Sequence, residues 1–449
     1  MQELKVLTPT GMLGYGFPEE DFLKGLERNP DIMVADSGST DSGPQKLGNG
    51  SMTCHADSYR AELLILLTAV NRHKIPLYIS SAGGAGSNLQ VDIIQKIAKE
   101  ICSQQGYSLK IASIYADIPK DVVKQKLNDG KVKPCGKAVP ELTQEELAKT
   151  TTVVAQMGIE PFFEPIERGV DVIIAGRAYD PVPLAAYGIH KGFDPALCWH
   201  MGKIMECGGM CAQPSSQVIL GTLRDDHFEL EPLNGESCCT EMSVAAHTMY
   251  EKSHPYLLAG PGGVLDLSKC RFEQLDNRRV KVSGSQFKSA PYTVKLEGAK
   301  MVGYRATTLA GIRDPNVIAA LDELEGMSNG FAQQSYPQFE GRYKMIFHVY
   351  GRDGVLGPLE PDPTPGKEVC VVVEVLADTQ DIAMQVCSKA RIALLHGPYS
   401  GRIATSGNCG LIFTPLEIPL GETYEFNLYH LMEVDDPCQH FPVSYYEFG

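Results

Sequence analysis

Residues 76–88 read Pro-Leu-Tyr-Ile-Ser-Ser-Ala-Gly-Gly-Ala-Gly-Ser-Asn, and this stretch decides the fold class. Pro76–Ser80 predicts a short apolar strand that ends in a glycine-rich turn. The apolar residues after the turn recur at helical spacing: Val91, Ile94, Ile97, Ala98 and Ile101. A strand that enters a helix through such a loop is typical of a parallel sheet covered by helices. The segment therefore predicts an α/β fold.

The same order of elements recurs through the first 215 residues. Further strands are predicted at 4–7, 32–35, 110–115 and 170–175, and helices at 17–28, 59–70, 145–157 and 164–168. We therefore expect residues 1–215 to form an α/β ligand-binding domain with a mostly parallel, Rossmann-like sheet.

The pattern changes after residue 215. Residues 216–330 alternate short β-like runs with turn residues, and they either complete the first domain or form a second one. A polar, glycine-containing joint at Met327–Gly330 then leads into residues 331–449, which predict a C-terminal α+β domain. The full prediction is an α/β domain with a β-rich insertion and an α+β module.

Composition excludes several classes of protein. The 449 residues carry 40 Lys and Arg against 55 Asp and Glu, a net charge of −15, which argues against nucleic-acid binding. No apolar run approaches the roughly 18–20 residues of a membrane span, and no signal peptide is visible. Thirteen cysteines without a C-x-x-C pair fit reduced thiols. We expect a cytoplasmic protein, without nucleic-acid or membrane partners, that forms a homo-oligomer.

Four glycine-containing loops follow the carboxyl ends of predicted strands, at 10–16, 36–43, 80–88 and 176–180. Because these ends meet at one edge of a parallel sheet, we expect one crevice that binds a small anion, either a carboxylate or an acyl-CoA. Tight turns alone could also explain the glycines. The predicted substrate-binding residues are Thr10, Gly11, Ser37, Ser81, Gly83, Gly84, Ser87, Asn88 and Asp180.

The catalytic candidates are Asp36, His55, Glu206 and Arg177. A carboxylate or imidazole would move a proton, and Arg177 would grip the anion in a bidentate fashion. His55 could instead belong to the cap of the helix at 59–70, and Arg177 could only pin its turn through Asp180. On the catalytic reading, Arg177→Ala should abolish turnover and leave the melting temperature nearly unchanged.

No cofactor is expected. Gly11, Gly14 and Gly16 follow the order G-x-x-G-x-G rather than the dinucleotide fingerprint G-x-G-x-x-G. No metal site is predicted either, although a metal-assisted reaction at Asp36, Asp41 and His55 stays open as an alternative.

Two motifs carry a family resemblance. Gly176-Arg177-Ala178-Tyr179-Asp180, followed by Glu206-Cys207-Gly208, resembles the "GR…D" and "ECG" pattern of the acyclic terpene utilisation (AtuA-type) family. Residues 81–88, 243–251, 261–266 and 292–298 are also similar to that family, although Ser81 stands where the family has Asn. The resemblance implies a role in the breakdown of carboxylic acids or acyl-CoA compounds and does not define the reaction.

The leading hypothesis is a cytosolic enzyme that abstracts a proton next to a carboxylate or thioester. Hydratases, dehydratases, isomerases and carbon–carbon lyases share this step. The rival hypotheses are the metal-assisted lyase and a non-catalytic scaffold or binding subunit of a catabolic complex.

Overall fold

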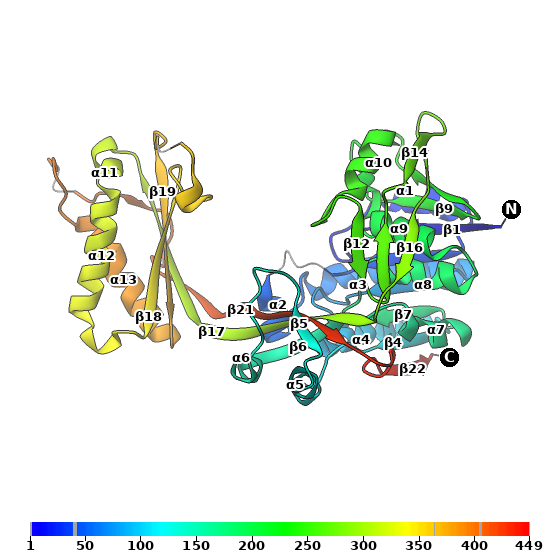
Figure 1. Cartoon of the computed structure of the whole chain (residues 1–449). Coiled ribbons are helices and arrows are strands. Elements are labelled where there is room, and N and C mark those ends of the chain that lie inside the picture. The colour runs from blue at the N-terminus through cyan, green and yellow to red at the C-terminus, as the bar shows by residue number, and fades with distance from the viewer. Residues whose placement is uncertain (1, 39–42, 363, 404–405, 449) are drawn as a thin grey trace. The chain divides into compact units, whose positions relative to one another are not determined.

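The computed structural model describes residues 2–38, 43–362, 364–403 and 406–448. The chain forms two compact units, Met1–Lys300 with Phe426–Gly449, and Met301–Glu425 (Figure 1). The predicted divisions after residues 215 and 330 fall inside these units and not between them. In particular, the expected joint at Met327–Gly330 lies within helix α12 (Leu321–Ser335).

The first unit contains a sheet whose centre is parallel. Its parallel strands run in the order β1 (Glu3–Thr8), β2 (Ile32–Asp36), β3 (Leu77–Ser80), β7 (Val172–Ala175) and β4 (Lys110–Ile114). Nearly every residue of these strands is buried, as expected for a sheet with helices on both faces. The prediction of a mostly parallel α/β sheet in the N-terminal part is confirmed.

Helices cover the two faces of this sheet and form two separate cores. Residues of α1 (Glu19–Glu27), α3 (Ala56–His73) and α4 (Asn88–Gln105) pack in one core. The other core holds residues of α5 (Lys120–Asn128), α6 (Gln144–Lys149), α7 (Glu160–Glu167), α8 (Val182–His190) and α9 (Pro195–Met205). Because helices cover both faces of the sheet, a ligand-binding site is expected at the ends of the strands.

Antiparallel strands extend the sheet to ten strands. They are β9 (Ile219–Arg224), β10 (His227–Pro232), β15 (Val280–Ser283) and β14 (Arg271–Gln274) beyond β1, and β22 (Val443–Glu447) beyond β4. The other elements of this unit are α2 (Pro44–Asn49), β5 (Val132–Pro134), β6 (Thr150–Gln156), η2 (Gly208–Cys211), β8 (Ala212–Gln213), β11 (Cys238–Cys239), α10 (Glu241–Thr248), β12 (Leu257–Gly260), β13 (Gly263–Asp266) and β16 (Gln286–Ser289).

The predicted helix at 145–157 is wrong over most of its length. The helix ends at Lys149, and Thr150–Gln156 form strand β6, which pairs with β17 (Thr293–Ile312). The run Thr150-Thr151-Thr152-Val153-Val154 consists of β-branched residues, which lose rotamer freedom in a helix and favour a strand. The correct reading matters because β6 carries Gln156 into the site described below.

The second unit is an α+β module with its own core. Strands β18 (Tyr343–Tyr350), β19 (Val369–Ala377), the later part of β17, β20 (Gly410–Leu411) and the first part of β21 (Ile418–Glu433) form its sheet. Alternate residues of β19 are buried in a core shared with α11 (Pro315–Ala319), α12 and α13 (Gln380–His396). Short 3₁₀ turns lie at Pro337–Phe339 (η3) and Gly357–Leu359 (η4).

Within the described ranges, no helix is both long enough and apolar enough to cross a membrane.

Candidate functional site

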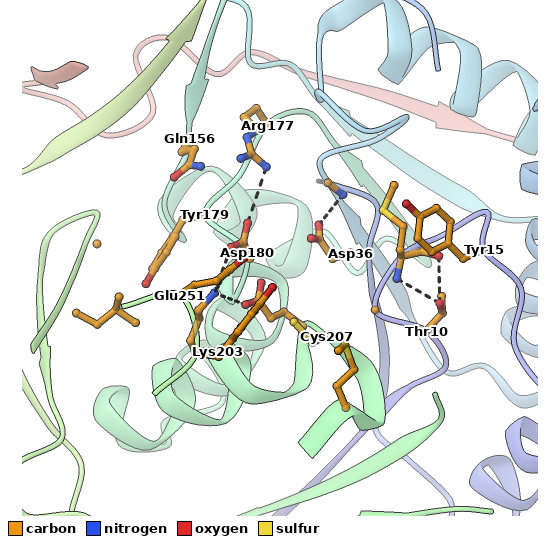
Figure 2. Close-up of a pocket in the computed structure, with 18 of the residues that line it drawn as sticks. Thr10, Tyr15, Asp36, Gln156, Arg177, Tyr179, Asp180, Lys203, Cys207 and Glu251 are labelled. Atoms are coloured by element: carbon orange, nitrogen blue, oxygen red, sulfur yellow. Dashed lines mark hydrogen bonds and ion pairs between the residues drawn. The ribbon is translucent and has the colours of Figure 1, made fainter. Parts of the chain in front are cut away.

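A cavity of about 1100 Å³ lies in the first unit, at the carboxyl ends of its parallel strands (Figure 2). The loop after β1 contributes Thr10, Gly11, Met12 and Tyr15, the end of β2 with its loop contributes Asp36 and Gly38, and the loop after β7 contributes Arg177, Tyr179 and Asp180. Further lining residues come from the end of α9, from strands β6, β17 and β21 and from the segment after α10. They include Lys203, Glu206, Cys207, Gln156, Lys295, Tyr429 and Glu251. Three of the four predicted loops therefore meet at one cavity.

Asp36 is the last residue of β2, and its side chain is buried. The hydroxyl of Ser80, at the end of the neighbouring strand β3, donates to Asp36 Oδ1 over 2.8 Å. The amides of Ser37 and Gly38 donate to the same oxygen over 2.9 and 3.2 Å. The parallel pairing of β2 and β3 thus fixes this carboxylate at the cavity wall.

Arg177 follows β7 and is held mainly by Glu297, 120 residues further along the chain. Its Nε and Nη2 donate to the two carboxylate oxygens of Glu297 over 2.8 and 3.2 Å, and both side chains are almost fully buried. The remaining Nη1 donates to Ser81 Oγ over 3.3 Å and lies 3.8 Å from Asp180 Oδ1. Only this end of the guanidinium is directed toward the cavity carboxylates (Figure 2).

Lys203 links the acidic side chains at the end of α9. Its Nζ donates to Glu206 one helical turn later, lies 3.5 Å from Asp180 Oδ2 and 3.1 Å from Glu251 Oε2. The Lys203 and Glu206 side chains are only 7% and 5% exposed. One ammonium thus contacts three carboxylates that lie far apart in the sequence.

Burial and neighbouring charges raise the pKa of two of these carboxyl groups and lower that of a third. Burial, and the nearby Asp180, raise the pKa of Asp36 to about 7 and that of Glu206 well above its usual range. Burial also acts on Asp180, but Lys203 and Arg177 hold the pKa of that carboxyl below its ordinary value. The site therefore keeps one carboxylate ionised beside two that bind protons more readily.

The structure brings six of the thirteen predicted site residues to the cavity wall: Thr10, Gly11, Asp36, Arg177, Asp180 and Glu206. His55 is not among them, because its side chain is 80% exposed and its Nδ1 accepts a hydrogen bond from the Asp57 amide at the start of α3. The helix-cap alternative describes the position of His55, which lies away from this cavity. Ser37 is buried beside Asp36 but does not line the cavity.

The glycine-rich loop that decided the fold is closed to the cavity. A Cβ on Gly84 would lie 2.0 Å from Thr53 Oγ1, and one on Gly83 would lie 2.8 Å from Gln90 and Met52. The loop is therefore packed against its own neighbours, and no residue from 81 to 88 lines the cavity.

The polar groups of that loop are also used internally. Ser87 caps α4, and its amide donates to Gln90 Oε1. Asn88 Oδ1 accepts from the amides of Ala116 and Asp117, while Ser81 Oγ accepts from Arg177 Nη1 and from the Ala178 amide. The structure therefore places Gly83, Gly84, Ser87 and Asn88 away from the cavity, and anion binding by these residues stays a prediction.

The predicted site residues do not include two lysines of the cavity wall, Lys203 and Lys295, or Glu297, which pairs with Arg177. Lys203 lies three residues before Glu206, so the helical spacing of a Lys–Glu pair could have revealed it. Lys295 and Glu297 lie two residues apart on β17. Lys295 Nζ lies 3.3 Å from Glu297 Oε1 and 3.0 Å from Tyr429 Oη. No local signal connects this strand with Arg177.

Fold and site together define an open-sheet α/β protein whose ligand-sized cavity holds charged side chains at the strand ends. The chain belongs to the acyclic terpene utilisation family (AtuA), whose family model matches residues 32–217 and 231–409. Arg177 with Asp180 and Glu206, the residues of the two motifs that carry the resemblance, meet in the cavity. Comparisons with curated proteins and with solved structures give no match.

Proposed function

We propose that this protein is a cytoplasmic enzyme, a lyase or isomerase of carboxylic-acid or acyl-CoA catabolism, that removes a proton next to a carboxylate or thioester. The observation that carries the proposal is the close approach of Asp36 and Glu206 to Lys203 and Arg177 in one cavity. Carboxylates can accept and return a proton, and buried cations stabilise the negative charge that then develops on the substrate.

The three cationic side chains of the site have two kinds of role: they hold neighbouring carboxylates, and they can contact the substrate. The Nε and Nη2 atoms of Arg177 are occupied by Glu297, so Nη1 is the part that can face developing charge. Lys203 lies between Asp180 and Glu206, and its ammonium can turn toward a substrate oxygen while it keeps one of these partners. Lys295, with a side chain 24% exposed, is a third candidate anchor for a carboxylate or phosphate.

The size of the cavity favours a substrate larger than a short carboxylic acid. Its volume of about 1100 Å³ is at the upper end of ordinary small-molecule sites. Tyr15, Met210 and Tyr250 line it and are largely exposed, so an acyl chain would find apolar contacts toward the solvent side. An acyl-CoA or a long-chain carboxylic acid fits this combination of a charged wall and an apolar wall.

The test is deuterium uptake from D₂O by a panel of carboxylic acids and their CoA thioesters, incubated with the full chain and followed by NMR. We expect the enzyme to label the carbon next to the carboxyl group of at least one panel member. Uptake at the uncatalysed rate by every member would contradict the proposal and favour the scaffold hypothesis.

The metal-assisted alternative at Asp36, Asp41 and His55 receives no support in that form. His55 is exposed and does not line the cavity that contains Asp36. Asp41 lies outside the described residues.

A further inference from the structure

The buried charges around the cavity do not balance. Asp36, Asp180, Glu206 and Glu297 are four largely buried carboxylates, and they share the three cations Arg177, Lys203 and Lys295. Of the other acids in the cavity wall, Asp21 has its own partner in Lys24, and the Glu251 side chain is 48% exposed. Fully ionised, the four buried carboxylates would leave one excess negative charge in a place where water is scarce, and such a charge calls for a partner.

Three of these carboxylates are also grouped in a way that suits a cation. Asp36, Asp180 and Glu206 each offer an oxygen, and the three oxygens lie within 4.8 Å of one another. Oxygens on opposite sides of a Ca²⁺ ion are about 4.8 Å apart, and those around Mg²⁺ are somewhat closer, so small side-chain rotations would complete the contact. Lys203 contacts Asp180 and Glu206, and Arg177 Nη1 lies 3.8 Å from Asp180 Oδ1.

A second observation concerns a small inner cavity behind these three side chains. Its free volume is about 10 Å³. Thr8, Ser80, Asp36, Asp180 and Glu206 form its polar side, and the rest of the lining is Val34, Ala35, Pro181, Pro183, Leu184, Gly202 and Met205. This is about the space that one water-sized atom occupies. Thr8 is 1% exposed, and its hydroxyl has no hydrogen-bond partner among the residues that the structure describes.

A buried hydroxyl without a partner is costly, so its position beside an atom-sized space bounded by three carboxylates points to a bound species. Ser80 does not satisfy that need: its hydroxyl donates to Asp36, and no hydrogen bond joins it to Thr8 in the described residues. An oxygen-only set of three carboxylates and a hydroxyl matches the preference of hard divalent cations and not that of softer metals, which take nitrogen and sulfur ligands.

We propose that Asp36, Asp180 and Glu206 bind one hard divalent cation of the Mg²⁺, Mn²⁺ and Ca²⁺ group, with Thr8 beside it. One such ion would offset the excess negative charge of these carboxylates and leave a positive balance. It would also let an anionic substrate approach a wall of carboxylates that would otherwise repel it. This inference departs from the sequence-based expectation of a metal-free site, and it goes beyond the proposed reaction because cation binding needs no substrate.

The test uses the full chain stripped with EDTA and titrated with Mn²⁺, with free Mn²⁺ read by electron paramagnetic resonance. We expect one equivalent bound per chain. Glu206→Gln and Asp36→Asn keep the side-chain shape and remove a ligand charge, so each should weaken binding at least about tenfold. Glu251→Gln is the matched control, because Glu251 also contacts Lys203 but lies outside the group of three; its affinity should stay within about twofold.

Circular dichroism first establishes that each variant is folded. If Glu206→Gln does not fold, Thr8→Val gives the equivalent reading, with an expected loss of several-fold in Mn²⁺ affinity. The inference is overturned if the wild-type chain binds no stoichiometric Mn²⁺, if the folded ligand variants bind as tightly as wild type, or if Glu251→Gln loses as much as Glu206→Gln. Deuterium uptake without Mn²⁺ binding would reject the cation and keep the proposed reaction.

Discussion

Arg177 lines the cavity and also pairs with the buried carboxylate of Glu297. This ion pair changes the effect that we expect from removing the Arg177 side chain. The side chain is 4% exposed and forms two hydrogen bonds with the equally buried Glu297. Arg177→Ala would leave Glu297 with Lys295 as its remaining charged partner. We expect the free energy of unfolding to fall by about 3–5 kcal/mol, and the nearly unchanged melting temperature expected from the sequence no longer applies.

Urea unfolding followed by circular dichroism measures this loss. Arg28→Ala is the control, because Arg28 pairs with Glu231 while its own side chain is 51% exposed, and it should cost about 1 kcal/mol or less. Equal losses in the two variants would show that the Arg177–Glu297 pair contributes no more than a surface pair.

His200 predicts a pH dependence of stability that is separate from the site. Its ring is buried in α9 and bonded to Ser285 Oγ (2.8 Å) and Thr248 Oγ1 (3.1 Å). Burial, helped by Lys252, lowers the pKa of His200 from 6.5 to about 3. Below pH 6.5 His200 therefore binds a proton in the unfolded chain but not in the folded chain. The free energy of unfolding consequently falls as the pH falls from 6.5 toward 3.

Between pH 7.5 and pH 5 this single group should remove about 2 kcal/mol from the free energy of unfolding. His200→Gln keeps a hydrogen-bonding side chain without this proton uptake, so its stability should change less over the same range. Urea titrations at four pH values measure the difference in slope. Parallel curves for wild type and His200→Gln would contradict the assignment.

At the scale of the element, close packing explains the glycines in the loop between β3 and α4. Gly84 has φ +115° and no room for a Cβ beside Thr53, whereas Gly106, which ends α4 with φ +67°, faces open space. Gly106→Ala should cost about 1 kcal/mol for the backbone alone, and Gly84→Ala clearly more, because Thr53 must also move. Melting temperatures of the two variants test this order, and equal shifts would show that the loop adapts freely.

The sequence predicts elements better than it predicts what their loops do. Apolar runs and glycine-rich turns correctly placed β2, β3 and β7, and the rule that parallel strands end at one edge brought Asp36, Arg177 and Asp180 into one expected site. Glu206 was proposed separately, at the end of a predicted helical stretch. The same pattern could not tell a glycine that approaches a ligand from one that packs against Thr53. It also missed Glu297, because an ion pair across 120 residues depends on how β17 joins β6, and the 150–156 run was itself misread as a helix.

At the scale of the whole molecule, every residue of the cavity wall belongs to the first unit. Leu394 lies in the core of the second unit and is fully buried. Leu394→Ala should lower the stability of that unit by about 2–5 kcal/mol and leave the Mn²⁺ affinity of the folded chain within about twofold of wild type. Chemical denaturation and the Mn²⁺ titration together check this, and a parallel loss of affinity would mean that the second unit helps to shape the site.

The central claim is that the proton transfer takes place at the Asp36–Glu206 side of the cavity. The most direct measurement is the deuterium uptake assay on chains stripped with EDTA, with the panel compound that wild type labels fastest, in Glu206→Gln and in His55→Ala. Without a divalent cation, the loss of a cation ligand does not contribute to the result. We predict that Glu206→Gln loses at least about a hundredfold in rate, in line with the loss of a general acid or base, while His55→Ala, altered at an exposed helix cap, keeps nearly the wild-type rate. A Glu206→Gln variant that is folded and labels the compound as fast as wild type would contradict the account.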